Sequence, residues 1–115
     1  MQPHPAFRAA ILHPRVNVAL LDLQGRVDIY AGPRLKELLF GAIAQGSRHI
    51  IVDLSKVTDL DSTGLGVLVA AAKRAGTASL AIVCSDQKLS GLLALVGLDR
   101  AFAICTSRTA ALAGC

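Results

Sequence analysis

Aromatic residues are scarce in this sequence. They make up 3% of its 115 residues, and tryptophan is absent. Proteins that hold single-stranded nucleic acid stack its bases on aromatic side chains, so this composition argues against such a role. The twelve lysines and arginines are spread along the chain and leave a net charge of only +4. Because no basic cluster forms, we expect a solvated surface and no nucleic-acid partner.

Motifs for metal and redox chemistry are also lacking. The chain has three cysteines and no Cys-x-x-Cys pair, so no metal site, no catalytic site of this kind and no cofactor is expected. Cys84 and Cys105 lie in apolar runs and are predicted to be buried thiols, while Cys115 is the last residue. This cysteine usage is typical of a reducing compartment and predicts a cytoplasmic protein.

Long apolar stretches are missing as well. No stretch of 18 residues is apolar and free of charge, which is the length that a membrane-spanning helix needs. Residues 1–10 lack the apolar core of a signal peptide. We therefore expect no leader and no direct insertion into a membrane.

Strand-like and helix-like segments alternate along the chain. Runs of apolar and β-branched residues predict strands at residues 6–12, 16–23, 49–54, 79–84 and 101–105. Apolar residues at helical spacing predict helices at residues 35–43, 65–74, 89–96 and 106–114. Strands separated by helices pair in parallel through right-handed crossovers. The fold class is therefore α/β, in the order β-β-α-β-α-β-α-β-α.

The predicted domain organisation is simple. One domain covers residues 1–115, and its sheet is mixed and mostly parallel, with about five strands and about four helices. A flexible N-terminal arm is expected at residues 1–6. No linker, repeat or low-complexity segment interrupts the domain.

The stretch VTDLDSTGLGV, residues 57–67, concentrates the polar chemistry of the chain. Asp59 and Asp61 precede Ser62 and Thr63, and two glycines follow. The stretch joins a predicted strand to a predicted helix, and ligands of open α/β sheets bind at that end of the strands. A nucleophile, a phosphate cradle, a helix cap and a modification site are the four interpretations to weigh.

Two of these interpretations fit poorly. The nucleophile elbow of hydrolases reads Gly-x-Ser-x-Gly, whereas Leu60 stands two residues before Ser62. A general base is also missing near it, because His49 begins the preceding strand and is expected at the opposite edge. A dinucleotide cradle needs a third glycine where Val69 stands, and no Gly-Lys-Ser or Gly-Lys-Thr occurs.

The helix that follows has an unusually small outer face in projection. The side predicted to face the sheet comprises Leu65, Leu68, Val69 and Ala72. The opposite side, flanked by Ser62 and Lys73, comprises Thr63, Gly66, Val67, Ala70 and Arg74. Small residues permit close approach of another surface, so this side is interpreted as a docking face. The alternatives left open are a bland helix in an alanine-rich chain and a stretch in which Asp61 or Ser62 merely caps the helix.

Phosphorylation of Ser62 would turn such a face into a switch. A phosphate adds about −1.5 to −2 charge, which a helix N-terminus favours by roughly 0.3–1 kcal/mol. The neighbouring carboxylates offset part of this gain, so the fold should survive. Burying the same charge unmatched in an interface costs about 2–5 kcal/mol.

The motif DSTGLGV after HIIVDLSKVTDL resembles the STAS domain family, in particular the stand-alone bacterial anti-sigma factor antagonists. The segments GRVDIYAGPRL and LLALVGLDRAF resemble the family's segment before the first helix and its stretch before the last strand. The resemblance implies a STAS-type fold over nearly the whole chain. It also implies a non-enzymatic regulator of transcription that works by partner switching.

In that family the unmodified antagonist binds an anti-sigma factor that is also a serine kinase, which frees the sigma factor. The kinase phosphorylates the serine after the motif's aspartate, and a PP2C-type phosphatase reverses the step. The resemblance therefore implies Ser62 as phosphoacceptor, with Thr63 a weaker candidate, and ATP bound by the kinase. The predicted partner-binding residues are Asp28, Asp59, Asp61, Ser62, Thr63, Gly64, Gly66, Val67, Ala70, Lys73 and Arg74.

Two departures from the family pattern concern the choice of partner. Arg26 stands where an acidic residue is common, and Ala31-Gly32 stands where a Ser or Thr cap is common, which predicts a looser helix start. Two alternatives to the antagonist remain. One is a STAS subunit of another assembly, such as a lipid-transport ABC complex, and the other is a hydrolase that uses Ser62.

Overall fold

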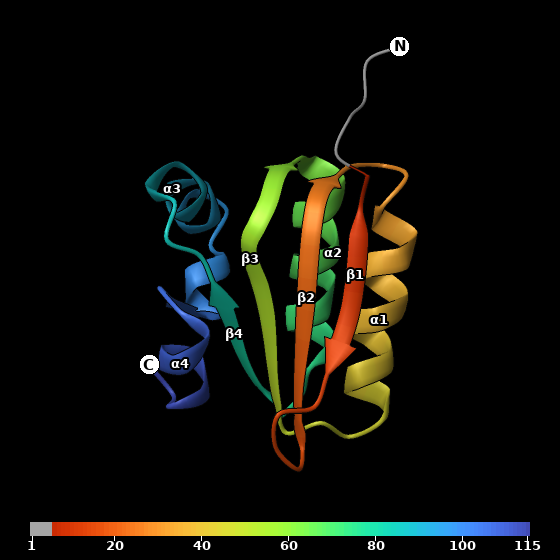
Figure 1. Ribbon diagram of the computed structural model, residues 1–115, viewed down its shortest axis with the longest axis vertical. Helices are drawn as coiled ribbons and strands as arrows, with labels where there is room; N and C mark the ends of the chain where they lie inside the picture. The colour runs from red at the N-terminus through yellow and green to blue at the C-terminus, as the bar shows by residue number, and fades with distance from the viewer. Residues whose placement is uncertain (1–5) are drawn as a thin grey trace.

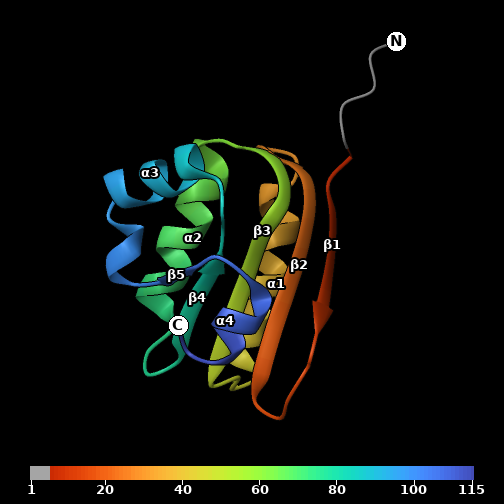
Figure 2. The same cartoon turned by 60° about the vertical axis from the view of Figure 1, so that its left-hand side comes forward.

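Five strands form one mixed sheet in the computed structural model, which describes residues 6–115. The strands lie side by side in chain order: β1 (Arg8–Leu12), β2 (Val18–Val27), β3 (His49–Leu60), β4 (Ser79–Val83) and β5 (Ala103–Cys105). Figure 1 shows the first four, and β5 is labelled beside β4 in Figure 2. β1 pairs antiparallel with β2, and all other neighbours are parallel. The predicted fold class is confirmed. The expected N-terminal arm lies almost entirely outside the described residues.

Helices cover both faces of the sheet, but unequally. Within residues 6–115, four α-helices follow the predicted order: α1 (Gly32–Ala44), α2 (Ser62–Arg74), α3 (Gln87–Leu95) and α4 (Arg108–Leu112). A 3-10 turn that was not predicted, η1 (Leu98–Arg100), follows α3. α1, α2 and α3 pack on one face, over the larger core. The five-residue α4 lies on the other face, over a smaller cluster that includes Leu20, Ile51 and Ala111 (Figure 2).

Both central strands are longer than predicted at their C-terminal ends. β3 continues six residues past Leu54, and β2 continues to Val27 with two irregularities in its pairing with β3. Beyond Asp53, β3 pairs only with β2, and Ser55 and Lys56 are exposed there. Because this extension is not buried on both faces, its residues lack the apolar pattern by which a strand is recognised.

The helix boundaries follow from local signals that the sequence carries. Pro33 lies in the first turn of α1, where a missing N–H is harmless. Gly46 and Gly97 have φ angles of +84° and +82°, and each follows a helix end as glycine commonly does. Asp86 caps α3 and Ser107 caps α4 through hydrogen bonds to backbone N–H groups.

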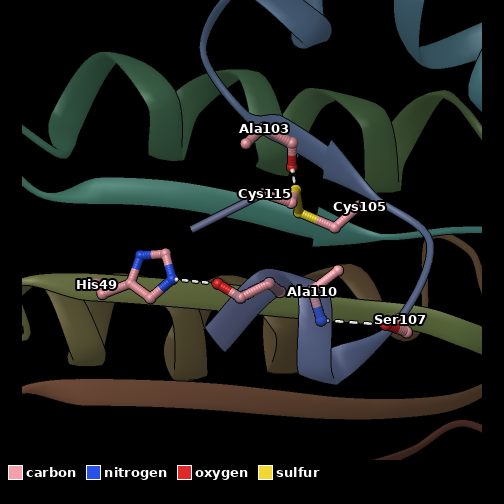
Figure 3. Close-up of a disulfide and its surroundings, with 7 residues drawn as sticks. His49, Ala103, Cys105, Ser107, Ala110 and Cys115 are labelled. Carbon is pink, nitrogen blue, oxygen red and sulfur yellow. Dashed lines mark hydrogen bonds between the residues drawn. A yellow bond between two sulfur atoms is a disulfide. The ribbon is translucent and has the colours of Figure 1, made fainter. Parts of the chain in front are cut away.

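A disulfide joins Cys105 at the end of β5 to Cys115 after α4, as Figure 3 shows. The prediction of a free Cys105 thiol is therefore wrong, while Cys84 is a buried free thiol as expected. The sequence pattern missed the bond because the two cysteines are ten residues apart and meet only after α4 folds back on the sheet. The cysteines no longer support a reducing compartment.

None of the helices within residues 6–115 has the length and apolar character needed to cross a membrane.

Candidate functional site

Two segments about thirty residues apart meet at the C-terminal edge of the sheet. Val27 pairs with Leu60 at the ends of β2 and β3, and the Asp61 N–H donates to the Val27 carbonyl at 3.2 Å. A Cβ on Gly32 would lie 2.7 Å from the Thr63 side chain. The residues on either side of the turn at residues 28–31 therefore contact the start of α2. We call residues 28–31 and 59–63 the rim.

Asp61, rather than Ser62, caps α2. Its Oδ1 accepts hydrogen bonds from the N–H groups of Thr63 at 2.9 Å and Gly64 at 3.3 Å. Asp61 has extended backbone angles, as an N-cap residue requires. Ser62 is the first helical residue, and its side chain is exposed. The hydroxyl of Ser62 thus lies outside the capping hydrogen bonds and faces solvent.

Thr63 is less accessible than its neighbour. It is half-buried, and its methyl group lies beneath Gly32. The two hydroxyl residues of the motif therefore differ in position although they are adjacent in sequence. An enzyme that modifies a hydroxyl here meets Ser62 first.

Asp28 shapes the turn before α1. Its Oδ1 accepts from the N–H groups of Tyr30 at 2.9 Å and Ala31 at 3.1 Å, and its carbonyl accepts from the Gly32 N–H at 2.9 Å. Ala31 itself makes no side-chain cap, as the sequence indicated. The carboxylate of Asp28 takes up N–H groups just before the helix, so the missing Ser or Thr does not leave them unmatched.

Arg26 and Asp59 are neighbours across β2 and β3. They are paired in the register, and Arg26 Nε lies 3.3 Å from Asp59 Oδ2. Both side chains are substantially exposed, so the pair contributes at most about 1 kcal/mol to stability. The basic residue at this position is therefore matched by an acidic partner within the same chain.

The predicted orientation of α2 is wrong by part of a turn. Its buried face comprises Gly64, Val67, Leu68 and Ala71. Val67, expected on the outer face, is 9% exposed, and Gly64, a predicted partner-binding residue, is buried. Leu65 and Val69 only flank the core. The projection placed the large apolar residues toward the sheet. Gly64 packs closely against Leu60 and Val27 instead, which rotates α2 so that Val67 is buried.

The rest of the predicted outer face is accessible in part. Ser62, Gly66, Lys73 and Arg74 are exposed, and Ala70 is half-buried. Arg74 and Lys36 of α1 both lie 5.4 Å from the centre of the Phe40 ring. The basic C-terminal end of α2, which is remote from Ser62, therefore packs against α1.

A hollow of about 230 Å³ lies beside the rim. The extended end of β3 and the first turns of α3 line it, with Asp59 and Lys88 among the charged residues and Leu92 among the apolar ones. Among residues 6–115, no cluster of three or more His, Cys, Asp or Glu side chains could hold a metal ion.

The histidine that begins β3 lies away from the rim. His49 is at the opposite end of β3 from Asp61, and its Nε2 is 3.1 Å from the carbonyl of Ala111 in α4 (Figure 3). This placement agrees with the sequence interpretation. His49 is therefore not positioned to activate the Ser62 hydroxyl as a general base.

The model of the STAS domain matches residues 10–111 of the chain. The chain belongs to the STAS domain family. It is 29% identical over 98 residues to the anti-sigma-F factor antagonist RsfB of Mycobacterium tuberculosis, covering 84% of this chain and 80% of that protein. It is 34% identical over 76 residues to the anti-sigma-B factor antagonist of Staphylococcus aureus, covering 64% of this chain and 70% of the relative.

A solved STAS structure agrees in fold. An anti-sigma factor antagonist from Mycobacterium paratuberculosis superposes with a TM-score of 0.86 at 23% identity, covering 95% of this chain and 93% of that one. At this identity the similarity supports the fold of the STAS domain and no finer conclusion. The five-stranded sheet and its helices thus form a fold that has been observed in another chain.

Two residues of this STAS domain were missed by sequence reasoning. Ile29 and Tyr30, in the turn of the rim, are 60% and 85% exposed. Neither residue belongs to the acid-and-hydroxyl motif, and neither lies in a predicted strand or helix. The signal was present, however, because large apolar residues between an aspartate and a Gly-Pro pair fall in a turn rather than in a core element.

Proposed function

We propose that this STAS domain is an anti-sigma factor antagonist switched by phosphorylation at Ser62. The unmodified chain binds an anti-sigma factor with serine kinase activity and so releases the sigma factor. The names of the relatives support the class of partner. The observation that carries the proposal is the exposed hydroxyl of Ser62, outside the cap and on the rim.

The modification follows ordinary phosphoryl transfer. The kinase binds ATP and transfers its γ-phosphoryl group to the Ser62 oxygen, which releases ADP and the hydroxyl proton. This chain needs only to present the hydroxyl, and the capping by Asp61 leaves it free to be presented. A PP2C-type phosphatase restores the serine by hydrolysis.

The magnitudes favour a switch that spares the fold. Phosphoserine at the first position of α2 gains roughly 0.3–1 kcal/mol from the helix N-terminus, and repulsion from Asp59 and Asp61 offsets part of it. In an interface the same charge costs about 2–5 kcal/mol, which is roughly 30- to 4000-fold in affinity. The complex dissociates while the domain stays folded.

The test uses purified protein and the serine kinase anti-sigma factors of the source organism, each expressed separately. With ATP, peptide mass spectrometry should find phosphate on Ser62 and none in Ser62→Ala. Ser62→Asp should weaken binding by 30-fold or more and leave the thermal midpoint within a few degrees. Ser79→Asp is the matched control, because Ser79 is also exposed but begins β4 at the opposite edge.

The contrary outcome is equally clear. The switch is ruled out if the kinase leaves Ser62 unphosphorylated and Ser62→Asp binds with the affinity of the wild-type chain. Such a result would direct attention to a STAS subunit of another assembly, in which the domain binds without modification.

A further inference from the structure

We infer that Ile29 and Tyr30 form an apolar anchor with which the chain docks on its anti-sigma factor beside Ser62. The inference rests on the proposed function and adds the surface that supplies the binding energy. It does not follow from the motif, because neither residue belongs to the acid-and-hydroxyl stretch. It follows from exposure, rigidity and position.

Ile29 and Tyr30 do not pack into the core of the domain. Tyr30 is 85% exposed and Ile29 60% exposed, whereas the neighbouring Val27 and Ala31 are buried. Tyr30 is the one tyrosine of the chain. Single exposed apolar residues are common, but an adjacent aromatic and β-branched pair on a turn forms a compact patch. Tyrosine is among the residues that most often dominate interface energies.

The turn that carries the pair is held rigid. One oxygen of Asp28 accepts from the N–H groups of both Tyr30 and Ala31, and two further bonds from the backbone close the turn on the Asp28 carbonyl. A side chain presented on a fixed turn loses little backbone freedom when it binds. The anchor is therefore preorganised, and Asp28 acts by positioning it.

Position connects the anchor to the switch. The turn rests on the first turn of α2 through Gly32 and Thr63, the residue after Ser62. A partner surface that covers Ser62 can therefore reach the turn at residues 28–31, because Val27 and Gly32 on either side of the turn contact Asp61 and Thr63. Phosphate on Ser62 would place charge beside an apolar contact, and a partner that covers Ser62 would strip water from it. The anchor accounts for why a single modification has a large effect on binding.

The charges at the rim favour a different chain as the occupant. Asp28 and Asp61 flank the anchor, and a two-fold contact between copies brings the same surface together on both sides. A contact centred on the anchor would bring the carboxylates of the two copies close together around its axis, which costs binding energy. A partner with basic residues around an apolar pocket would complement both the carboxylates and the apolar anchor. The anti-sigma factor is that partner in the proposed function.

The experiment measures the affinity of the full chain for the serine kinase anti-sigma factor that binds it, by calorimetry without ATP. Tyr30→Ala is expected to weaken binding by about 30-fold or more, and Ile29→Ala by less. Val16→Ala is the matched control, because Val16 is 88% exposed but lies in the β1–β2 turn at the other end of the sheet. The control should bind like the wild-type chain, and all variants should keep its thermal midpoint.

Each outcome decides the inference. A loss with Tyr30→Ala and none with Val16→Ala supports it. Wild-type affinity for Tyr30→Ala, with weak binding by Ser62→Asp, overturns the anchor and leaves the proposed function intact. If no anti-sigma factor binds the wild-type chain, the proposed function and the anchor both fail. If Tyr30→Ala only converts a dimer into a monomer in light scattering, the anchor serves a second copy and the inference is wrong.

Discussion

At the residue scale, two glycines of the DSTGLGV motif have opposite surroundings. A Cβ on Gly64 would collide with Leu60 Cδ1 and lie 2.8 Å from Val27 Cγ1, whereas a Cβ on Gly66 meets nothing within 4 Å. Gly64 therefore permits α2 to start close against the ends of β2 and β3. Gly66 has no such packing role, and it lies on the exposed side of the helix.

The contrast predicts opposite signs for two alanine substitutions. Gly64→Ala should lower the free energy of unfolding by about 1–3 kcal/mol, because Leu60 and Val27 must move. Gly66→Ala should raise it by up to about 1 kcal/mol through helix propensity. Urea denaturation of the two variants and the wild-type chain measures both. A neutral Gly64→Ala would show that the contact relaxes without cost.

The same scale explains how two adjacent hydroxyls differ. Local signals place Ser62 and Thr63 together at a helix start, and the family resemblance ranks Ser62 first. The structure adds a physical reason, because Thr63 is half-buried under Gly32 while Ser62 is exposed. Gly32 lies thirty residues away in sequence, so spacing within the motif could not reveal this difference.

At the element scale, α4 is the part of the fold that depends most on tethers. It has five residues, which is too short for a helix to persist without tertiary support. The disulfide between Cys105 and Cys115 brackets it. The Arg15 side chain donates to the Leu112 carbonyl at 3.2 Å, and His49 lies within hydrogen-bond distance of the Ala111 carbonyl.

Removal of the disulfide should therefore destabilise the domain. Closing a loop of this length contributes roughly 2–3 kcal/mol by restricting the unfolded chain, so we expect Cys115→Ser to lower the thermal midpoint by about 10 °C or more. Thermal melts with and without a dithiol reductant measure the change. The reductant should reproduce the loss in the wild-type chain and have no effect on Cys115→Ser. Equal midpoints throughout would contradict the prediction.

At the scale of the whole molecule, Arg108 holds α4 against the face of the sheet that carries the smaller core. Arg108 of α4 donates to Asp53 of β3 and lies 3.0 Å from Asp22 of β2, so it joins the helix to both central strands. Burial by itself would raise the pKa of Asp53, but hydrogen bonds from Ser55 and Arg108 outweigh it and hold that pKa below its ordinary value of 3.8.

The sign of this shift gives a pH dependence. A carboxyl whose pKa is lowered by folding stabilises the native state above its ordinary pKa, and that stability is lost as the pH falls through the lower folded value. Arg108→Gln should cost about 3 kcal/mol at pH 7, the low end for a broken buried pair because Arg108 is partly exposed. Without Arg108, only the hydrogen bonds from Ser55 oppose the effect of burial, so the pKa of Asp53 rises.

The wild-type chain and Arg108→Gln should therefore differ less in free energy of unfolding as the pH is lowered toward 3. The reason is that Asp53 becomes protonated more readily in the variant. Urea denaturation at pH 7 and about pH 3 measures it. Arg100→Gln is the control, since Arg100 is exposed and its removal should change stability by less than about 0.5 kcal/mol. If the loss of unfolding free energy in Arg108→Gln were equal at both pH values, Arg108 would not act by stabilising the Asp53 carboxylate.

The sequence by itself determined the order of elements, the mixed five-stranded sheet and the place of the acid-and-hydroxyl motif at a helix start. These features depend on patterns within a few residues, such as a capping residue at position 61 or 62 and the glycines after α1 and α3. Such patterns act through neighbouring backbone atoms, so they can be recognised without knowing what the segment packs against.

Only the tertiary structure decided which side of α2 is buried, which cysteines pair, and that Val27 and Gly32, on either side of the turn with Tyr30, contact the start of α2. The orientation of α2 follows from the approach of Gly64 to Val27 and Leu60, and the disulfide follows from α4 folding back on the sheet. Each depends on contacts between segments distant in sequence. Contacts of that kind are set by packing of the whole chain, which no local pattern records.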